Sequence, residues 1–202
     1  MGNVKLYGAT SGYVEVVPTA IAGASVLTLP AATGTLATTA DITTAVAAIV
    51  PGKILQVVST VKTDSLSTTS SSFIDITGFS ATITPSSSAN KVLIVAQISV
   101  GGEAQIKLSG GNTGTYIGDT AGSRTRAVFG YRQDVTNEFT GVAQSGVMIY
   151  LDSPATTSAT TYTAQIRTTS ATGAYVNRSK VDTDNSTYVR GASSITVIEV
   201  SA

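Results

Sequence analysis

Cysteine and histidine are both absent from the 202-residue sequence. The absence of cysteine excludes disulfides, thiolate nucleophiles and cysteine-ligated zinc, so the fold does not depend on the redox compartment. The absence of histidine removes the commonest general base and the commonest transition-metal ligand, which leaves lysine as the base for any nucleophilic serine. We therefore expect a protein that is not an enzyme, with no catalytic, cofactor-binding or metal-binding residues.

Charge is also scarce, since only 12% of the residues are charged and the 12 basic residues balance the 12 acidic ones. The basic side chains are scattered, so we expect neither nucleic acid nor an anionic membrane surface as a partner. No apolar run approaches the ~18 residues of a membrane span, and the N-terminus does not resemble a signal peptide.

Serine and threonine are abundant and make up more than a quarter of the sequence, beside 42% hydrophobic residues. Low charge disfavours long solvated helices, whose outer faces need charged side chains, whereas threonine, valine, isoleucine and tyrosine favour strands. The composition therefore predicts a mainly β fold, with one main domain and an appendage.

Residues 1–52 are predicted to form an N-terminal arm that cannot fold alone. The segments "YVEVV" (13–17) and "SVLTL" (25–29) alternate apolar and polar residues, which predicts two short strands. Two strands without a third layer are marginally stable in water, so the arm needs either another copy of itself or a docking surface.

At the end of the arm, the spacing of the apolar residues changes from that of a strand to that of a helix. In "TADITTAVAAIV" (39–50), Ile42, Val46 and Ile49 fall on one helical face, and Pro51 ends the run. A three-turn helix with one narrow apolar stripe is unstable alone. Two interpretations are open, a linker helix packed on its own domain and a short parallel bundle around a symmetry axis, and we favour the second.

Residues 53–202 are predicted to form the main domain, an antiparallel β-sandwich of the jelly-roll type. Strand-like segments recur along it, separated by turns rich in Gly, Ser, Asn or Pro. The polar run between the first two segments is interpreted as an ordered surface connection. The nine predicted strands span residues 53–62, 73–84, 91–100, 104–110, 126–133, 146–152, 160–169, 173–180 and 193–201.

Two of these segments are apolar on both faces. They are "KVLIVAQI" (91–98) and "SGVMIYL" (145–151), and this pattern is typical of strands buried from both sides. A two-layer sandwich covers only one face of each strand, so the other face requires cover from a subunit interface. The sequence therefore predicts an oligomer.

Three long stretches carry a resemblance that covers most of the chain. They are "LYGATSGYVEVVPTAIAGASVLTLPAATGTLATTADI" (6–42), "ILQVVSTVKTDSLSTTSSSFIDITGFSATITPSSSANKVLIVAQISV" (54–100) and the terminal "SSITVIEVSA" (193–202). Together they resemble the fibre and appendage proteins of tailed bacteriophages. The resemblance implies a homotrimeric virion component, assembled in the host cytoplasm, whose C-terminal domain is similar to the jelly rolls of tumour-necrosis-factor-like trimers.

The same resemblance implies partners for both parts of the chain. The arm is expected to dock other virion proteins of the capsid, portal or tail, and the C-terminal domain is expected to face a host-surface glycan or protein. Tail fibres, head fibres and capsid decoration proteins all use such modules, so the position on the virion is left open.

Acidic residues near the predicted turns are the candidates for a polysaccharide-degrading site, which needs two carboxylates across a sugar. We favour turn capping and solvation for them instead. The stretch "VDTDNSTY" (181–188) offers oxygen ligands for calcium, but it lacks the turn Gly and the bidentate Glu of an EF-hand loop. The carboxylate candidates are Asp119, Asp134, Glu138, Asp152, Asp182 and Asp184, and Asn185 completes the calcium set.

Other polar and aromatic residues are candidates for contacts rather than chemistry. Arg124 and Arg126 share a loop with Asp119, where they could bind an anionic sugar, although we favour an inter-subunit ion pair or a solvated loop. "NRS" at Asn177 matches the N-glycosylation pattern but carries little weight without a secretion signal. Four tyrosines lie near predicted loops, where aromatic rings hold sugars or pack between subunits: Tyr116, Tyr131, Tyr175 and Tyr188.

Three functions follow, in order of preference. The first is a trimeric fibre or spike that attaches to the host surface, and the second is a decoration or head-fibre protein that stabilises the capsid shell. The third is a polysaccharide-degrading spike, which requires a carboxylate pair in a groove. No residue is assigned as a receptor contact.

Overall fold

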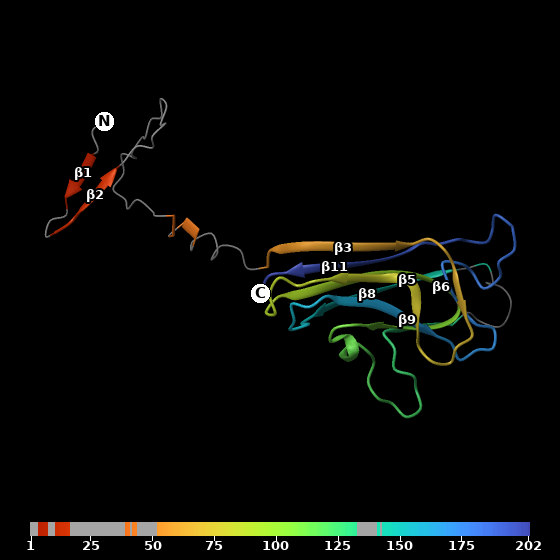
Figure 1. Cartoon of the computed structure of the whole chain (residues 1–202). Coiled ribbons are helices and arrows are strands. Elements are labelled where there is room, and N and C mark those ends of the chain that lie inside the picture. The colour runs from red at the N-terminus through yellow and green to blue at the C-terminus, as the bar shows by residue number, and fades with distance from the viewer. Residues whose placement is uncertain are drawn as a thin grey trace. The chain divides into compact units, whose positions relative to one another are not determined.

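The computed structural model describes residues 4–7, 11–16, 39–40, 42–43, 52–132, 141 and 143–202. The chain divides into two compact units, Met1–Ala45 and Val46–Ala202 (Figure 1). The predicted strand at 25–29 and the last two residues of the predicted helical stripe, Val46 and Ile49, lie outside the described residues. No helix in the described ranges is long and apolar enough to cross a membrane.

The described part of the N-terminal unit is a β-hairpin followed by a helical segment. Strands β1 (Val4–Tyr7) and β2 (Tyr13–Val16) pair antiparallel, and β2 coincides with the first predicted strand of the arm. Residues 39–40 and 42–43 are helical, where the predicted helix begins. The Thr43 hydroxyl donates a hydrogen bond of 2.8 Å to the carbonyl oxygen of Thr39, one turn earlier.

The larger unit is mainly β, which confirms the prediction from composition. Its strands join into one antiparallel sheet that curls until it is nearly barrel-like, with a single short 3-10 helix among the described residues. The strands are β3 (Ile54–Lys62), β4 (Leu66–Thr68), β5 (Ile74–Ile83), β6 (Lys91–Ser109), β7 (Phe129–Arg132), β8 (Gln144–Asp152), β9 (Thr160–Arg167), β10 (Ala174–Val176) and β11 (Ser193–Val200).

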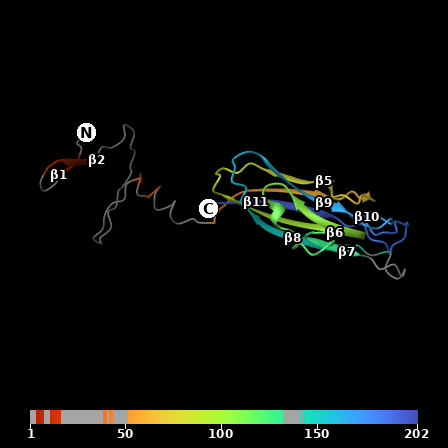
Figure 2. The same cartoon turned by 90° about the horizontal axis from the view of Figure 1, so that it is seen from below.

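Strand β6 belongs to both halves of this sheet. Its first half pairs with β8 on one side and with β11 on the other, and β11 in turn pairs with β3. Its second half pairs with β7 and β9, and β9 pairs with β5. The two halves face each other across the core, as the view from below shows (Figure 2).

Gly101 and Gly102 form the corner at which β6 passes from one half to the other. Gly102 has a φ of +73°, and a Cβ there would lie 2.5 Å from the carbonyl oxygen of Gly173. Only glycine tolerates both the backbone angle and the close approach. The sequence pattern predicted two separate strands, 91–100 and 104–110, and this prediction is wrong because the strand bends at the glycine pair without breaking.

The core lies between the two halves and is built from every second residue of their strands. In β6, β9 and β11 the buried and half-buried positions alternate, as the period of a strand requires. Each fully buried aliphatic side chain contributes about 1.5–3 kcal/mol to stability. The largest buried side chains include Tyr162, Phe79, Ile76, Ile83, Ile94, Ile98, Ile106, Met148, Ile166 and Ile195.

Two buried carboxylates are held by hydrogen bonds within this core. The Asp152 carboxylate, which is 0% exposed, accepts a hydrogen bond of 2.6 Å from the Tyr162 hydroxyl and one of 3.1 Å from the Asn112 backbone N–H. Burial and the Asp152 carboxylate together raise the pKa of Tyr162. The phenol therefore stays protonated and keeps donating to Asp152 throughout the physiological range.

Glu199 is the second buried carboxylate and is 1% exposed. It accepts hydrogen bonds from Nδ2 of Asn90 at 2.6 Å, from Nε2 of Gln56 at 2.7 Å, and from the hydroxyl and backbone N–H of Ser86 at 2.8 and 2.7 Å. Burial alone raises the pKa of Glu199, but these hydrogen bonds outweigh it and lower the pKa to about 2. The charged carboxylate thus ties β3, β11 and the turn after β5 together.

The chain joins the larger unit beside its own C-terminus. The Ser201 backbone N–H donates to the Lys53 carbonyl at 2.9 Å, and the Lys53 N–H donates to the Ser201 hydroxyl at 3.0 Å. At the other end of β3, Asn177 Nδ2 donates to the Lys62 carbonyl at 2.8 Å. Strand β3 has nine residues, so the loops around Asn177 lie about 30 Å from Lys53.

Candidate functional site

An aliphatic surface covers the outer side of the sheet half made by β3, β11, the first half of β6 and β8. The strand register places Val57, Ile198 and Leu93 side by side in one row. Leu151 of β8 completes that row. We call this surface the aliphatic face, and its apolar members are Ile54, Val57, Val61, Leu93, Val95, Val147, Ile149, Leu151, Ile198 and Val200.

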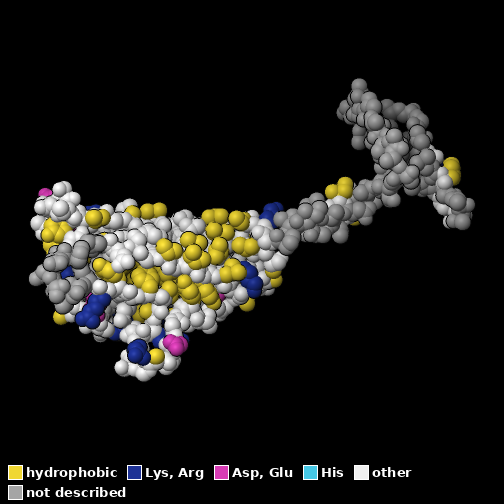
Figure 3. Space-filling view, turned by 180° about the vertical axis from the view of Figure 1, so that it is seen from behind, with side chains coloured by type: hydrophobic (Ala, Val, Ile, Leu, Met, Phe, Trp, Pro, Cys, Tyr) yellow, Lys and Arg dark blue, Asp and Glu magenta, His cyan; other side chains and the backbone are white. Residues whose placement is uncertain are grey.

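Most of the aliphatic face is open to solvent in the single chain. Six of its side chains, on β3 and β8, are between 54% and 63% exposed. Lys91 is the only charged residue at the paired positions of this face, and its Nζ donates to the Ser153 hydroxyl at 2.7 Å. Figure 3 shows hydrophobic side chains gathered over one broad side of the larger unit. Exposed apolar patches of this kind are typical of interaction surfaces.

The sequence predicted burial on both sides for 91–98 and 145–151. In the single chain the outward residues of β6 are half-buried, whereas Val147, Ile149 and Leu151 of β8 are each more than half exposed. In one chain by itself, β8 is therefore buried on one side only. That a subunit interface covers this face stays a prediction.

The outer side of the other half, which we call the polar face, pairs many of its polar side chains with one another, although Oε1 of Gln105 and Nε of Arg167 are buried there without a hydrogen-bond partner. It lies over β5, β9 and the second half of β6. The Thr82 and Thr161 hydroxyls hydrogen-bond at 2.7 Å. Lys107 and Arg167 lie over the Phe73 ring, with Nζ and Cζ at 4.7 and 5.7 Å from its centroid.

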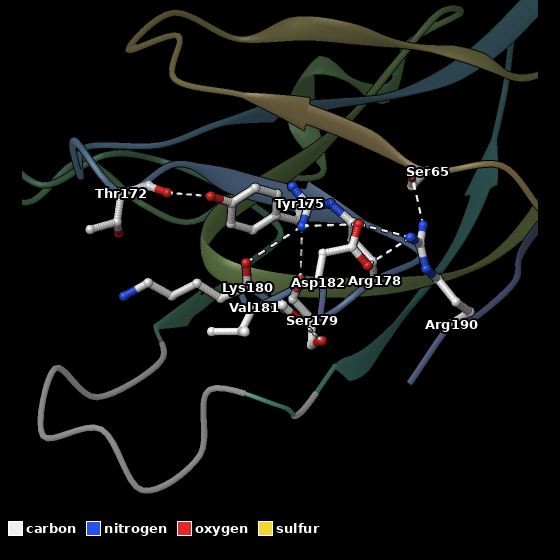
Figure 4. Close-up of polar contacts among 9 residues, drawn as sticks. All are labelled: Ser65, Thr172, Tyr175, Arg178, Ser179, Lys180, Val181, Asp182 and Arg190. Carbon is white, nitrogen blue, oxygen red and sulfur yellow. Dashed lines mark hydrogen bonds and ion pairs between the residues drawn. The ribbon is translucent and has the colours of Figure 1, made fainter. Parts of the chain in front are cut away.

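A second candidate surface lies at the end of the domain far from Lys53, where two arginines share one carboxylate (Figure 4). Nη2 of Arg190 lies 2.6 Å from Oδ1 of Asp182, and Nη1 of Arg178 lies 3.7 Å from Oδ2 of the same residue. The Arg178 guanidinium also lies over the Tyr175 ring, with Cζ 3.9 Å from the ring centroid. The Tyr175 hydroxyl donates to the Thr172 carbonyl at 2.6 Å, which holds the ring in place.

A shallow hollow of about 330 Å³ opens beside this pair. Its lining combines one cation, one aromatic ring and several hydroxyls: Ser67, Thr68, Thr69, Gly173, Tyr175 and Arg178. Strand pairing fixes part of this wall, because Tyr175 of β10 lies opposite Ser67 of β4 and opposite Gly101 of β6. Strand β4 was read as a surface connection in the sequence, since a three-residue strand inside a serine-threonine run has no distinctive pattern.

The structure does not assemble the candidate carboxylates into a hydrolytic pair among the described residues. Asp152 is buried in the core, Asp182 is bonded to arginines, and Asp119 and Asp184 are exposed. Asp134 and Glu138 lie outside the described residues.

The calcium candidate in 181–188 also finds other partners. Asn185 Oδ1 accepts hydrogen bonds from the backbone N–H and the hydroxyl of Thr187, at 3.0 and 2.8 Å, which is a turn motif. Asp182 is engaged by Arg178 and Arg190. No group of three potential metal ligands occurs in the described ranges.

The remaining polar candidates have local structural partners. Arg126 Nε donates to the Gly118 carbonyl at 2.6 Å, and neither Arg126 nor Arg124 forms an ion pair with Asp119 in the described part of the chain. Asn177 is 1% exposed and donates both Nδ2 hydrogens to backbone carbonyls, so it presents no accessible amide for glycosylation. Its φ of +59° ends β10, which explains why the predicted strand 173–180 is shorter than expected.

Three of the four candidate tyrosines support the fold. Tyr116 stacks on Tyr150 with the ring centroids 4.9 Å apart, and its hydroxyl accepts the Ile149 N–H at 3.3 Å. Tyr131 packs against the core, and Tyr188 lies against Gly141. Tyr175 lines the hollow that holds Arg178, and Tyr188 lines a separate hollow together with Arg190. The arginine over the Tyr175 ring was not singled out in the sequence.

The sequence contains two Ser-x-x-Lys segments, 59–62 and 88–91. In both of them the lysine is bonded to a residue other than the serine of its segment. Lys62 Nζ lies 2.6 Å from Oδ2 of Asp64, and Lys91 Nζ donates to Ser153.

Comparison of the chain with protein-family models gives no match, and comparison with curated proteins gives none either.

Proposed function

We propose that this protein is a structural, non-enzymatic component of a bacteriophage virion. In this proposal it is a homotrimeric fibre or spike, in which the arm (1–52) anchors and trimerises the chain and a jelly-roll domain (53–202) projects toward the host surface. The resemblance of the three long stretches to phage appendage proteins supplies the class of protein and the number of subunits.

The aliphatic face is the observation that carries the proposal. Six of its side chains are between 54% and 63% exposed, across a surface with a single charged residue at the paired positions. Stable interfaces bury about 800 Å² per partner and have an apolar centre with few charges. A second copy of the same chain supplies a matching apolar surface, and the only charge at the paired positions of the face is that of Lys91, whose Nζ donates to the Ser153 hydroxyl.

The larger unit has two distinct ends, and this supports an arrangement in which one end is anchored and the other faces outward. Lys53, where the arm joins, is bonded to Ser201 at one end, and the loops with Arg178 and Arg190 lie at the other end of β3. A domain held at the first end presents the second to its surroundings. Several weak sites per trimer and many trimers per particle would raise avidity without a deep pocket.

Antibody labelling of intact particles, viewed by electron microscopy, tests this proposal. Label on the tail tip supports host attachment, and label over the head supports the decoration or head-fibre function. Particles that assemble, infect and carry no label anywhere would contradict a virion role. Incubation of purified protein with host polysaccharide tests the third function, because degradation lowers the viscosity and binding alone does not.

A further inference from the structure

The hollow beside Tyr175 has the chemistry of a site for an acidic sugar, and this inference deepens the proposed function because it names the class of surface ligand. Arg178 and Arg190 share the single carboxylate of Asp182, at 3.7 and 2.6 Å. Two guanidinium groups against one carboxylate leave one positive charge uncompensated within the cluster. The shorter contact belongs to Arg190, so the excess charge resides on Arg178.

The Arg178 guanidinium is held in one orientation, but some of its N–H groups have no hydrogen-bond partner. Its Nη1 makes only long contacts, to the carbonyl oxygens of Ser179 and Lys180 at 3.4 and 3.5 Å. Its Nε and Nη2 donate to no described residue. Stacking on Tyr175 fixes the plane of the group, so the two free donors are positioned before any ligand arrives. A planar guanidinium with two free N–H groups is suited to a carboxylate.

The rest of the lining fits the hydroxyls of a sugar. Ser67 and Thr69 are exposed, and their hydroxyls make no hydrogen bond to any described residue. Thr68 Oγ1 is used internally, since it accepts the Ser70 N–H at 3.0 Å. The glycine corner lets the wall approach this closely, because a Cβ on Gly101 would lie 2.5 Å from the Arg178 carbonyl oxygen.

We propose that this hollow binds the carboxylated sugar unit of an acidic surface polysaccharide. The carboxylate lies on Nε and Nη2 of Arg178, and the sugar hydroxyls meet Ser67 and Thr69. A neutral sugar leaves the guanidinium without a partner, so the site discriminates in favour of the charged form. All of the lining residues belong to one chain, so a trimer carries three such sites.

The test is a nuclear magnetic resonance titration of the full chain with trigalacturonate, with its neutral methyl ester, and with inorganic phosphate. We expect trigalacturonate to shift the Arg178 Nε–H resonance and the amides of 172–179. Arg178→Gln should weaken binding about tenfold or more, and Arg178→Lys should weaken it less. Arg126→Gln, which removes an exposed loop arginine outside the hollow, should leave binding unchanged.

Ser67→Ala and Thr69→Val serve as variants that cannot disturb the fold through lost internal hydrogen bonds, and together they should weaken binding severalfold. Equal binding of the ester, binding of phosphate without trigalacturonate, or no binding by the folded chain would overturn the inference. Sedimentation of the same sample separates the two proposals. A trimer that does not bind contradicts only the sugar site, whereas a monomer that binds contradicts only the trimer.

Discussion

The two outer faces of the larger unit are built on the same alternation but differ in chemistry. On the polar face, Thr82 bonds to Thr161 and Gln165 Nε2 donates to Asp75 at 2.7 Å. On the aliphatic face, valine, isoleucine and leucine occupy most of the paired positions. Two hydrogen-bonded polar pairs lie among them, Ser59 with Thr196 at 2.9 Å and Gln97 with Ser145 at 2.8 Å.

The two faces therefore differ in how they interact with water. Most hydroxyls and charged groups of the polar face bond to one another or meet water, so this face gains little from being covered. Exposed aliphatic groups gain about 25 cal/mol for each Å² removed from water, so the aliphatic face gains stability only when it is covered. We therefore propose that the aliphatic face makes the subunit contact and that the polar face meets solvent.

The largest expected effect comes from a charge placed in the aliphatic face. Val57→Asp puts a carboxylate at the β3 end of the row that Val57 shares with Ile198 and Leu93. Burial of an unpaired charge costs several kcal/mol, so the trimer should dissociate at micromolar concentration. Sedimentation velocity measures this. Thr77→Asp, on the exposed side of β5, is the matched control, and equal dissociation by both variants would erase the distinction between the faces.

The next effect concerns the corner that joins the two halves. Gly102→Ala should lower the free energy of unfolding by about 2–4 kcal/mol, because the added Cβ meets the Gly173 carbonyl at 2.5 Å and the φ of +73° is strained. Gly122→Ala shares the strain, with a φ of +60°, but has nothing within 4 Å. Its loss should be about 1 kcal/mol. Urea unfolding compares them, and equal losses would show that the close approach is unimportant.

Glu199 should make stability depend on pH. Its pKa in the folded protein is about 2, below the ordinary value of 4.5. The charged form is thus favoured by folding, and this stabilisation is complete above about pH 5 and is lost as the pH falls through 2. Glu199→Gln should cost about 3 kcal/mol at pH 7 and much less at pH 2. Urea unfolding at both pH values is the measurement, and a loss that does not change with pH would contradict this account.

The smallest effect sharpens the comparison by completing the aliphatic face. Thr196→Val replaces a hydroxyl in the centre of that face with a methyl group, so subunit association should tighten by about 1 kcal/mol. Thr161→Val makes the same change on the polar face, where it removes the bond to Thr82 and gains no contact. Sedimentation equilibrium distinguishes the variants, and weaker association of Thr196→Val would count against the assignment of the faces.

The sequence predicted the strands wherever alternation was strong. Strands β3, β5, β9 and β11 lie within two residues of the predicted bounds. The errors arose at special backbone positions. Gly101 and Gly102 resemble a turn in sequence but form a bend within β6, and Asn177 ends β10 because its φ is positive.

The candidate sites were less accessible to prediction. The segments 91–98 and 145–151 carry apolar residues on both faces, which predicted a second face that needs cover. Only the strand register with β3 and β11 shows that the outward residues form one continuous surface. Tyr175 was singled out by its aromatic ring near a loop. Its arginine partner and the hydroxyls of β4 were not, because Ser67 is more than a hundred residues away in sequence and reaches the site only through strand pairing.

Sedimentation equilibrium of the full chain at micromolar concentration is the decisive test of whether the aliphatic face is a subunit interface. We expect the mass of three chains, with no monomer detectable until the protein is diluted or Val57 is replaced by aspartate. A stable monomer at that concentration would contradict it, since the aliphatic face would then remain exposed in solution.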